Sequence, residues 1–352
     1  MGAATKWVTL LALAAVACGT ESASELTASS DSDAAKHHLQ IVLFPPWTPV
    51  GLPFLPVAIN DAGLIAGNQA GAAVLYDSST GVLAALPQPP ARTTGDYAAV
   101  DVSSTGAVLG RNRYERFAGA IWQSGSSSPL LIGIPPVGYN FVPNAISAGG
   151  QVVGSAPDAG VAYRWSGGFT ALPLPATLRG NYAEATDVND AGYVVGVAFS
   201  FSSQIVHVIL WSPSGAATRL ASLYDLKDRP RIRNAGDVFW SDRNGVVHRW
   251  SGGTYSQPVM PPGFESLTGV SEAGRLIGTL VVSGARRGWT SFQGSVSFLD
   301  PPVAQPGDYF VPAGVDTCGD IVGVVYRAPT ATTSGLRFSK YFPPCDLQPV
   351  MQ

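Results

Sequence analysis

The hydrophobic and polar positions of this chain form a unit of four short alternating segments that recurs along it. In one copy, NYAEATDV (181–188) alternates up to an Asn-Asp-Ala-Gly turn, and residues 193–198 follow as a second such segment. Residues 206–211 and 218–223 come next, separated by a Pro-Ser-Gly turn. Alternation over about four to eight residues between turn signals predicts β-strands. Each unit is therefore expected to form four strands joined by hairpins.

The turn between the first two segments carries a nine-residue phrase that recurs seven times. The copies are INDAGLIAG (59–67), VSSTGAVLG (102–110), ISAGGQVVG (146–154), VNDAGYVVG (188–196), IRNAGDVFW (232–240), VSEAGRLIG (270–278) and VDTCGDIVG (315–323). Their first glycines are spaced by 43, 44, 42, 44, 38 and 45 residues. A period of about 40–45 residues with several strands per unit is the signature of propeller blades. We predict an all-β chain, a seven-bladed β-propeller with four-stranded blades.

The two ends of the repeat region predict how the ring closes. Six blades have a fourth strand followed by proline, whereas the seventh ends after SKYFPP (339–344) without one. The segment HLQIVLFPP (38–46) has the missing pattern, so this amino-terminal strand is expected to complete the carboxy-terminal blade. Such a closure leaves no open sheet edge. The propeller is assigned to residues 38–345, and residues 346–352 form a tail.

Each blade has a bulky ring near the end of its third strand and a glycine at the end of its first hairpin loop. The rings are Tyr76, Trp122, Trp165, Trp211, Trp250, Trp289 and Phe338. They are expected to fill the wedge between neighbouring sheets rather than to bind a ligand. The glycine supplies a positive φ, and the Asn-Asp pair before it in two copies can bond to the turn backbone. A calcium loop is the other interpretation of that pair, but the acidic spacing of such loops is absent.

The amino terminus has the pattern of an export signal. An apolar run of eleven residues at 7–17 follows Lys6, and small residues precede Cys18. The run is too short to span a bilayer but suits a signal peptide at 1–17. The tetrad AVAC (15–18) resembles the lipobox of bacterial lipoproteins, in which the cysteine is acylated. Ordinary secretion by cleavage near this point is the alternative.

The segment after the lipobox predicts where the protein resides. Gly19 follows the cysteine, which in such lipoproteins favours the outer membrane over the inner one. Residues 18–37 are rich in Ser, Ala and acids, so we expect a lipidated cysteine followed by a disordered tether. The predicted location is an outer-membrane lipoprotein or the cell surface, with secretion as the alternative.

Composition narrows the classes of partner and of chemistry. Charged residues make up 13% of the chain and the net charge is −3, which leaves no electrostatic footprint for nucleic acid. Contact with the membrane is expected only through the lipid. No Walker loop, HExxH, CxxC or Gly-x-Ser-x-Gly elbow is present, and the four histidines suit packed strands or the tether. We predict no cofactor, no metal, no catalytic residue and a monomer.

Two cysteines remain once Cys18 is acylated. Cys318 lies in the first hairpin turn of blade seven, and Cys345 follows the third strand, which runs back to the same end. An exported compartment permits a disulfide between them, which would close a loop within the closing blade. Two buried free thiols are the alternative.

The blade phrase, with its IND-x-G-x-VVG turn and a Trp some fifteen residues on, resembles the HAF-repeat family of extracellular propellers. The likeness covers residues 38–345 and is clearest at 59–63 and 188–192. Blade five departs from it, with Trp240 where the second glycine belongs, and blade seven has Cys318 beside its glycine. The resemblance implies a propeller of a bacterial exported protein, and it implies no active site.

The candidate site lies on the face where loops join one blade to the next, which we call the connecting face. Several of its loops carry glycine, an acid or amide, and an aromatic ring, which suits stacking on sugars or clamping a peptide. Alternatively, each ring caps the start of its own inner strand. The candidate residues in these loops are Asp96, Tyr97, Tyr139, Asn181, Tyr182, Asp308 and Tyr309.

Blade five adds three arginines, Arg229, Arg231 and Arg233, at alternate positions of its inner strand. The period of a strand places them on one face. If that face lines the channel, they are suited to bind a carboxylate or a phosphate. Solvated charges on a poorly formed strand are the alternative.

These observations predict an exported, lipid-anchored, non-catalytic propeller that recognises a glycan or another envelope polymer at the connecting face. A scaffold whose rim loops dock an envelope protein is the first alternative. A hydrolase or lyase with carboxylates at the channel mouth is the second. Display without a specific ligand is a further one, because propeller folds host many functions.

Overall fold

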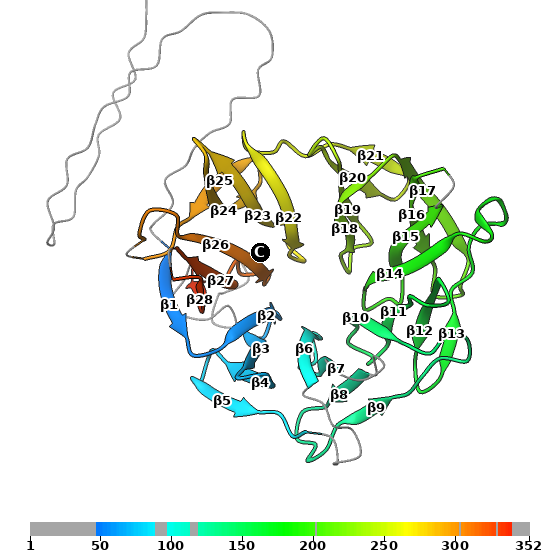
Figure 1. Ribbon diagram of the computed structural model, residues 1–352, viewed down its shortest axis with the longest axis horizontal. Coiled ribbons are helices and arrows are strands. Elements are labelled where there is room, and N and C mark those ends of the chain that lie inside the picture. Colours follow the sequence, from blue (N-terminus) through cyan, green and yellow to red (C-terminus); the bar gives the residue numbers. More distant parts are fainter. Residues whose placement is uncertain are drawn as a thin grey trace, which may run out of the picture. The chain divides into compact units, whose positions relative to one another are not determined.

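The computed structural model describes residues 47–88, 97–112, 119–200, 203–302, 304–328 and 330–339. All of them belong to one unit, Leu39–Gln352. They form seven four-stranded antiparallel sheets arranged in a ring (Figure 1). The fold is a seven-bladed β-propeller, as the repeats predict.

The strands of each blade follow one another outward from the axis of the ring (Figure 1). Blades 1 to 3 are β2 (Leu55–Ile59), β3 (Leu64–Gln69), β4 (Ala72–Asp77), β5 (Val82–Ala85); β6 (Tyr97–Val102), β7 (Val108–Asn112), β8 (Gly119–Trp122), β9 (Leu130–Ile132); and β10 (Val142–Ile146), β11 (Val152–Ala156), β12 (Val161–Trp165), β13 (Phe169–Ala171). Blades 4 and 5 are β14 (Tyr182–Val188), β15 (Val194–Ser200), β16 (Ile205–Trp211), β17 (Ala217–Leu223); and β18 (Leu226–Ile232), β19 (Val238–Asp242), β20 (Val247–Ser251), β21 (Thr254–Ser256). Blade 6 is β22 (Phe264–Val270), β23 (Leu276–Val282), β24 (Ala285–Phe292), β25 (Ser295–Leu299), and one 3-10 turn, η1 (Ala176–Leu178), joins blades 3 and 4.

Blade 7 combines strands from both ends of the described chain. Its inner three strands are β26 (Tyr309–Val315), β27 (Ile321–Arg327) and β28 (Thr332–Ser339), and its outer strand is β1 (Thr48–Leu52). The predicted closure by an amino-terminal strand is confirmed, but the prediction named the wrong segment. Residues 38–46 lie outside the described residues, and the closing strand follows them. Leu52 and Phe54 are buried between blades 7 and 1. Their packing holds the segment directly before β2 in place, and this segment includes the end of the closing strand.

The two glycines of each repeat have different roles. Gly192 ends the first hairpin turn of blade 4 with φ 79°, and the equivalent glycines of the other blades also have positive φ. Gly196 lies where β14 bulges between Ala185 and Asp187, and a Cβ there would overlap the carbonyl oxygen of Glu184. The second glycine therefore allows the inner strand to approach its neighbour closely at the bulge.

Blade 5 lacks this second glycine, and its inner strand is irregular. Trp240 takes the glycine's position in β19. The register of β18 shifts on both sides of Asp228, so that Arg229 and Pro230 are unpaired with β19. The inner strand of this blade thus departs from the others at the point where its arginines lie.

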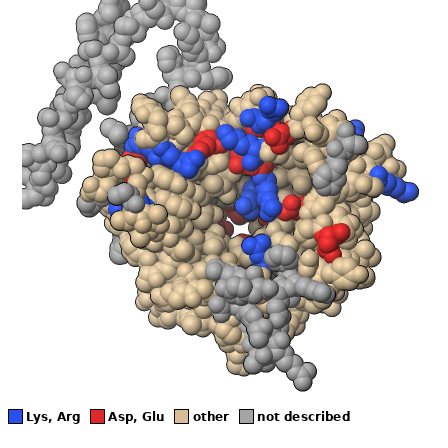
Figure 2. Space-filling model, viewed as in Figure 1, with Lys and Arg blue, Asp and Glu red and all other residues tan. Residues whose placement is uncertain are grey.

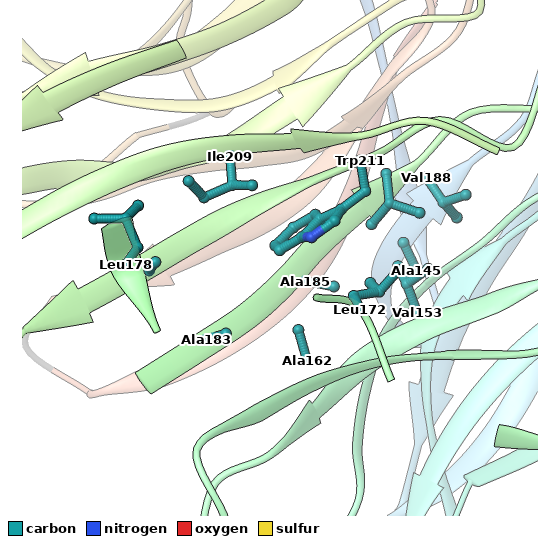
Figure 3. Packing of buried hydrophobic residues seen from close by; sticks show 12 residues of the cluster. Ala145, Val153, Ala162, Leu172, Leu178, Ala183, Ala185, Val188, Ile209 and Trp211 are labelled. Atoms are coloured by element: carbon teal, nitrogen blue, oxygen red, sulfur yellow. The ribbon is translucent and has the colours of Figure 1, made fainter. Parts of the chain in front are cut away.

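The third-strand rings fill the wedges between blades, as predicted. Trp211 is fully buried among apolar side chains of blades 3 and 4, including Ala145, Val153 and Val188 (Figure 3). Its indole N–H donates to the carbonyl of Pro173 at 2.6 Å, which anchors the connection between the two blades. The seven rings are buried or half-buried: Tyr76, Trp122, Trp165, Trp211, Trp250, Trp289 and Phe338.

Candidate functional site

The asparagine of the repeated turn joins neighbouring blades. The side-chain oxygen of Asn189 accepts the backbone N–H of Tyr193 at 2.9 Å, which closes its own turn. Its amide nitrogen donates to the carbonyl of Arg233 in blade 5 at 3.1 Å. Asn60 makes the same pair of bonds, to Leu64 at 2.9 Å and to Ser103 of blade 2 at 2.8 Å. The predicted turn role is confirmed and extends to the contact between blades.

The aspartates of these turns also bond to neighbouring turns. Asp61 accepts the backbone N–H of Thr317 in blade 7 at 2.8 Å, and Asp190 accepts that of Ala148 in blade 3 at 2.7 Å. Within the described ranges, no group of three or more His, Cys, Asp or Glu side chains could hold a metal ion. The most repeated polar residues therefore hold the ring of blades together.

The inner strands enclose a central cavity of about 460 Å³. Figure 2 shows the connecting face, where the molecule is hollowed at its centre and Lys and Arg side chains gather at the opening and along one side of it. The ionisable and amide side chains that line the cavity are Asn60, Asp61, Asp101, Arg111, Asn144, Asp187, Asn189, Asp190, Arg229, Arg231, Asn234 and Glu272. The cavity is polar and carries charges of both signs.

Two aspartates deep in this cavity join inner strands of neighbouring blades. Asp101 accepts the N–H of Ile146 at 3.0 Å and that of Val102 at 2.9 Å. Burial raises the pKa of Asp101 to about 7 against the opposing effect of these bonds, and the charge of Asp187 adds to the rise. The pKa of Asp187 is raised by burial as well.

Asp187 repeats this arrangement in blade 4. It accepts the N–H of Ile232 at 3.0 Å and that of Val188 at 2.9 Å. Both oxygens of each carboxyl already accept backbone N–H groups. Bonding between blades therefore explains why these two buried carboxyls are present.

The structure separates the three arginines of blade 5. Arg229 and Arg231 line the cavity, as the hypothesis required, but Arg233 does not. The strand ends at Ile232, so Arg233 belongs to the turn, where its guanidinium lies 3.0 Å from the carboxylate of Asp237. Placing all three on one channel-lining face was therefore wrong.

The remaining two arginines differ in their partners. Arg229 pairs with Glu184 at 2.9 Å, although 62% of its side chain is exposed. Arg231 is half-buried and makes no hydrogen bond or ion pair with the residues that the structure describes, although its charge opposes the rise in the pKa of Asp101 and of Asp187. Arg111 of β7 lines the same cavity and is likewise without such a bond in the described chain. Two guanidinium groups with free donors thus face the cavity.

The predicted ring of aromatic side chains does not form as a set. Tyr97 is fully buried and packs edge to face against Trp122, so it belongs to the core between blades 1 and 2. Tyr139 is 71% exposed on the connection between blades 2 and 3. Asn181 is half-buried, and Asp96 lies outside the described residues. The proposed ligand role is therefore wrong for Tyr97.

The other two candidate tyrosines are half-buried at the starts of their inner strands. Tyr182 begins β14. Tyr309 stacks on Tyr326 with ring centroids 5.0 Å apart, and the guanidinium of Arg286 lies 5.1 Å from its centroid. Asp308 caps the adjoining loop by pairing with Arg327 at 2.9 Å. Tyr309, Tyr326 and Arg286 form a cluster on blades 6 and 7, whereas Tyr182 lies apart from it on blade 4.

Sequence reasoning missed Arg111, Lys227 and Tyr326. Arg111 follows a repeat glycine by one residue, and Lys227 lies two residues before Arg229. A search for charged residues next to the repeat glycines would have found Arg111. Tyr326 ends the pairing of β27 with β26, opposite Tyr309, and could have been found by pairing the two strands from the repeat glycine.

Two sequence predictions about cysteines remain predictions. Cys345 lies outside the described residues, so its disulfide with Cys318 stays a prediction, as does acylation of Cys18.

His207 and His248 lie in third strands, as predicted. His207 bonds to Ser222 at 2.8 Å, and His248 stacks on Trp240. Within the ranges that the structure describes, no helix is long and apolar enough to cross a bilayer.

Comparison with known proteins shows the fold of this chain and no more specific property. No family model and no curated protein matches this chain. Virginiamycin B lyase from Staphylococcus aureus is 12% identical, with TM-score 0.55 over 84% of this chain and 99% of that one. YCF48 bound to D1 peptide is 14% identical, with TM-score 0.54 over 85% and 98%. A chain of the mitotic checkpoint complex is 9% identical, with TM-score 0.54 over 91% and 99%. The shared property is the propeller.

Proposed function

We propose that this chain is an exported, non-catalytic recognition module whose connecting face binds an acidic segment of a protein in the cell envelope. The observation that carries the proposal is the pair of guanidinium groups, Arg231 and Arg111, that face the central cavity without a bonded partner among the described residues. A carboxylate can accept two parallel N–H bonds from one guanidinium, which makes arginine the preferred residue for this recognition.

The raised pKa values of two cavity carboxyls reduce the negative charge that opposes the binding of an anion there. Because the pKa of Asp101 is raised to about 7, its carboxyl carries less than a full negative charge near neutral pH. Arg231 therefore keeps part of its positive field in a low-dielectric channel, where charges act more strongly than in water. Lys227 and Arg229 extend this field at the opening.

A protein ligand agrees with the kind of site that propellers present. Two of the solved structures with this fold are named as a peptide complex and as part of a multiprotein assembly. The likeness does not carry their partners to this chain. The support for a peptide comes from the narrow, charged opening, which suits an extended segment with one acidic side chain.

The proposal is tested by binding of poly-L-glutamate to the purified mature chain, with poly-L-glutamine as the neutral counterpart. We expect binding of poly-L-glutamate alone, weakened by added salt because the attraction is electrostatic. Arg231→Ala and Arg111→Ala should each weaken it at least about tenfold. Arg219→Ala is the matched control, because Arg219 lies exposed on the outermost strand of blade 4. Equal binding by all four proteins would contradict the proposal.

Export and lipidation are part of the proposal and rest on the sequence pattern of residues 1–18. The resemblance of the turns to HAF repeats points the same way. In the bacterial host, we expect the wild-type chain to incorporate labelled palmitate and to fractionate with membranes, whereas Cys18→Ser should do neither. A soluble wild-type protein without label would show ordinary secretion or retention instead.

Glycan recognition is a second candidate, favoured by the cluster on blades 6 and 7. Tyr326 is 40% exposed while its ring is held by stacking on Tyr309, and exposed, pre-oriented rings suit stacking on sugars. Binding of an array of envelope glycans should then be lost in Tyr326→Ala and retained in Arg231→Ala. The reverse pattern favours the acidic-peptide proposal.

A further inference from the structure

The inner strand of blade 5 begins with an aliphatic side chain where the inner strands of five other blades begin with an aromatic ring. At the start of the inner strand, five blades place a ring against the preceding blade: Phe54, Tyr97, Phe141, Phe264 and Phe310. Blade 4 has Ala183 there, and Leu178 of η1 packs into the same cluster in place of a ring. Blade 5 has Leu226, which is only half-buried, and the ring that is buried in this gap comes instead from Trp240 of β19. A groove of about 310 Å³ remains at this position.

The walls of this groove are mostly apolar, and ionisable side chains of both signs line the rest of it. Tyr182, Val197, Phe199 and Val206 of blade 4 face Leu226 of blade 5 across it. Its other lining residues are ionisable: Glu184, Asp225, Lys227, Asp228 and Arg229. Glu184 is paired with Arg229, and Asp228 accepts the N–H of Leu267 at 2.8 Å.

The groove adjoins the central cavity. Arg229 lines both of them, and Arg231, two residues further along β18, faces the cavity alone. A ligand in the groove therefore has the guanidinium of Arg229, which is paired with Glu184, at its inner end, and an acidic group that extends into the cavity would reach Arg231. The exposed amine of Lys227 adds a third positive charge beside the groove.

We infer that the groove between blades 4 and 5 is a specificity pocket for one aromatic or large aliphatic side chain of the bound protein segment, next to an acidic residue held by Arg229 and Arg231. This inference rests on the proposed function and names its ligand class. The inserted side chain takes the place that a ring of the chain itself fills in five other gaps. Desolvated apolar anchors of this kind dominate the affinity of peptide interfaces.

The apolar walls favour a side chain over a sugar. A sugar hydroxyl buried against Val197, Phe199 and Val206 would lose its bonds to water without gaining a partner. An aromatic ring gains contact on all sides of such a pocket and has no polar group to desolvate. The charge pattern then selects ligands in which Asp, Glu or a terminal carboxylate adjoins that ring.

The test is selection of a phage-displayed library of random linear peptides on the immobilised mature chain, followed by anisotropy measurements with the labelled consensus peptide. We expect an aromatic or large aliphatic residue adjacent to Asp or Glu. Leu226→Phe should restore the missing ring, leave the unfolding midpoint equal or higher, and weaken the peptide roughly thirtyfold. Leu226→Ala should retain binding and shift the preference to larger rings. Val82→Phe, on an exposed outer strand, is the control and should change nothing.

The outcomes separate this inference from the function on which it rests. Acidic consensus peptides that need Arg231 but bind Leu226→Phe unchanged would overturn the groove and leave the acidic-segment proposal standing. Selected peptides without acidic residues, or a library that yields no binders, would overturn both.

Discussion

Asp101 of blade 2 accepts the backbone N–H of Ile146 in blade 3 at 3.0 Å, across the junction between two inner strands. Inner strands are sheet edges, so their channel-side N–H groups have no strand partner. A carboxyl from the preceding blade supplies the missing acceptor. Asp187 does the same for Ile232 at 3.0 Å, between blades 4 and 5. The ring is thus held by side-chain bonds at its axis as well as by apolar wedges.

Stability should depend on pH through Asp101. Its folded-state pKa of about 7 lies above the unfolded value near 3.8, so the folded chain binds the extra proton between these values. Its contribution to stability is complete below about pH 4 and is lost as the pH rises through about 7. Relative to Asp101→Asn, the wild type should lose roughly 1–3 kcal/mol between pH 5 and pH 8 in urea unfolding. A difference between the two proteins that does not vary with pH would contradict this assignment.

Asn189 should contribute more to the free energy of unfolding than an ordinary turn residue does. Asn189→Ala removes a bond within its turn and a bond to blade 5, so we expect a loss of about 1–2 kcal/mol in the free energy of unfolding. Asn244→Ala, in an exposed turn of blade 5, is the matched control and should change stability little. Equal effects of the two substitutions in denaturant titrations would show that the inter-blade bond contributes nothing.

Gly196, the second glycine of the repeat in blade 4, should tolerate no side chain. Gly196→Ala places a methyl group against the carbonyl of Glu184 at the bulge, and we expect a loss of roughly 2–4 kcal/mol. Gly168→Ala makes the same chemical change at a site with no neighbour within 4 Å of the added carbon. Thermal unfolding of both variants checks the prediction. A Gly196 variant as stable as the Gly168 variant would mean that the bulge relaxes freely.

The predicted disulfide should be visible in the intact mature protein. If Cys318 and Cys345 are bonded, thiol alkylation without reductant leaves both unlabelled. Cys345→Ser should then lower the free energy of unfolding by roughly 3–4 kcal/mol in the chain-entropy model. Labelling of both thiols in the unfolded, unreduced protein would establish the free-thiol alternative.

The periodic features of this fold could be predicted from the sequence, because each blade solves the same packing problem. Gly192 and the ring of Trp211 have equivalents in all seven blades, with the ring 13 to 19 residues after the glycine, and a feature that recurs seven times must serve the unit that repeats. The candidate site could not be predicted in the same way. Tyr97 and Tyr182 follow similar Gly-x-Tyr triplets but differ by one position along the inner strand. One position reverses the side of the sheet on which a side chain lies, which buries Tyr97.

The features that form the cavity and the groove are departures from the repeat. Trp240 replaces a glycine, and the register of β18 shifts between Asp228 and Arg231, the stretch that holds the two arginines of the cavity. Leu226 replaces a ring, but its equivalence to Phe264 is seen only once the bulges of β18 and β22 are known. The sequence pattern shows where a blade departs from the others, whereas the direction of the departing side chains depends on register.

Blade 7 combines β1 with three strands from the other end of the described chain, and this pairing determines when the molecule can finish folding. β1 is made early and pairs only with β28, so the partners Thr48 and Ser339 meet after nearly the whole propeller has been synthesised. Such distant pairing carries a large loop-closure entropy and slows folding. A chain crossing a membrane from its amino terminus would hold β1 without a partner until its last strand emerged. This topology is therefore compatible with the proposed export in an unfolded state, because the ring can close on the far side once β28 has crossed.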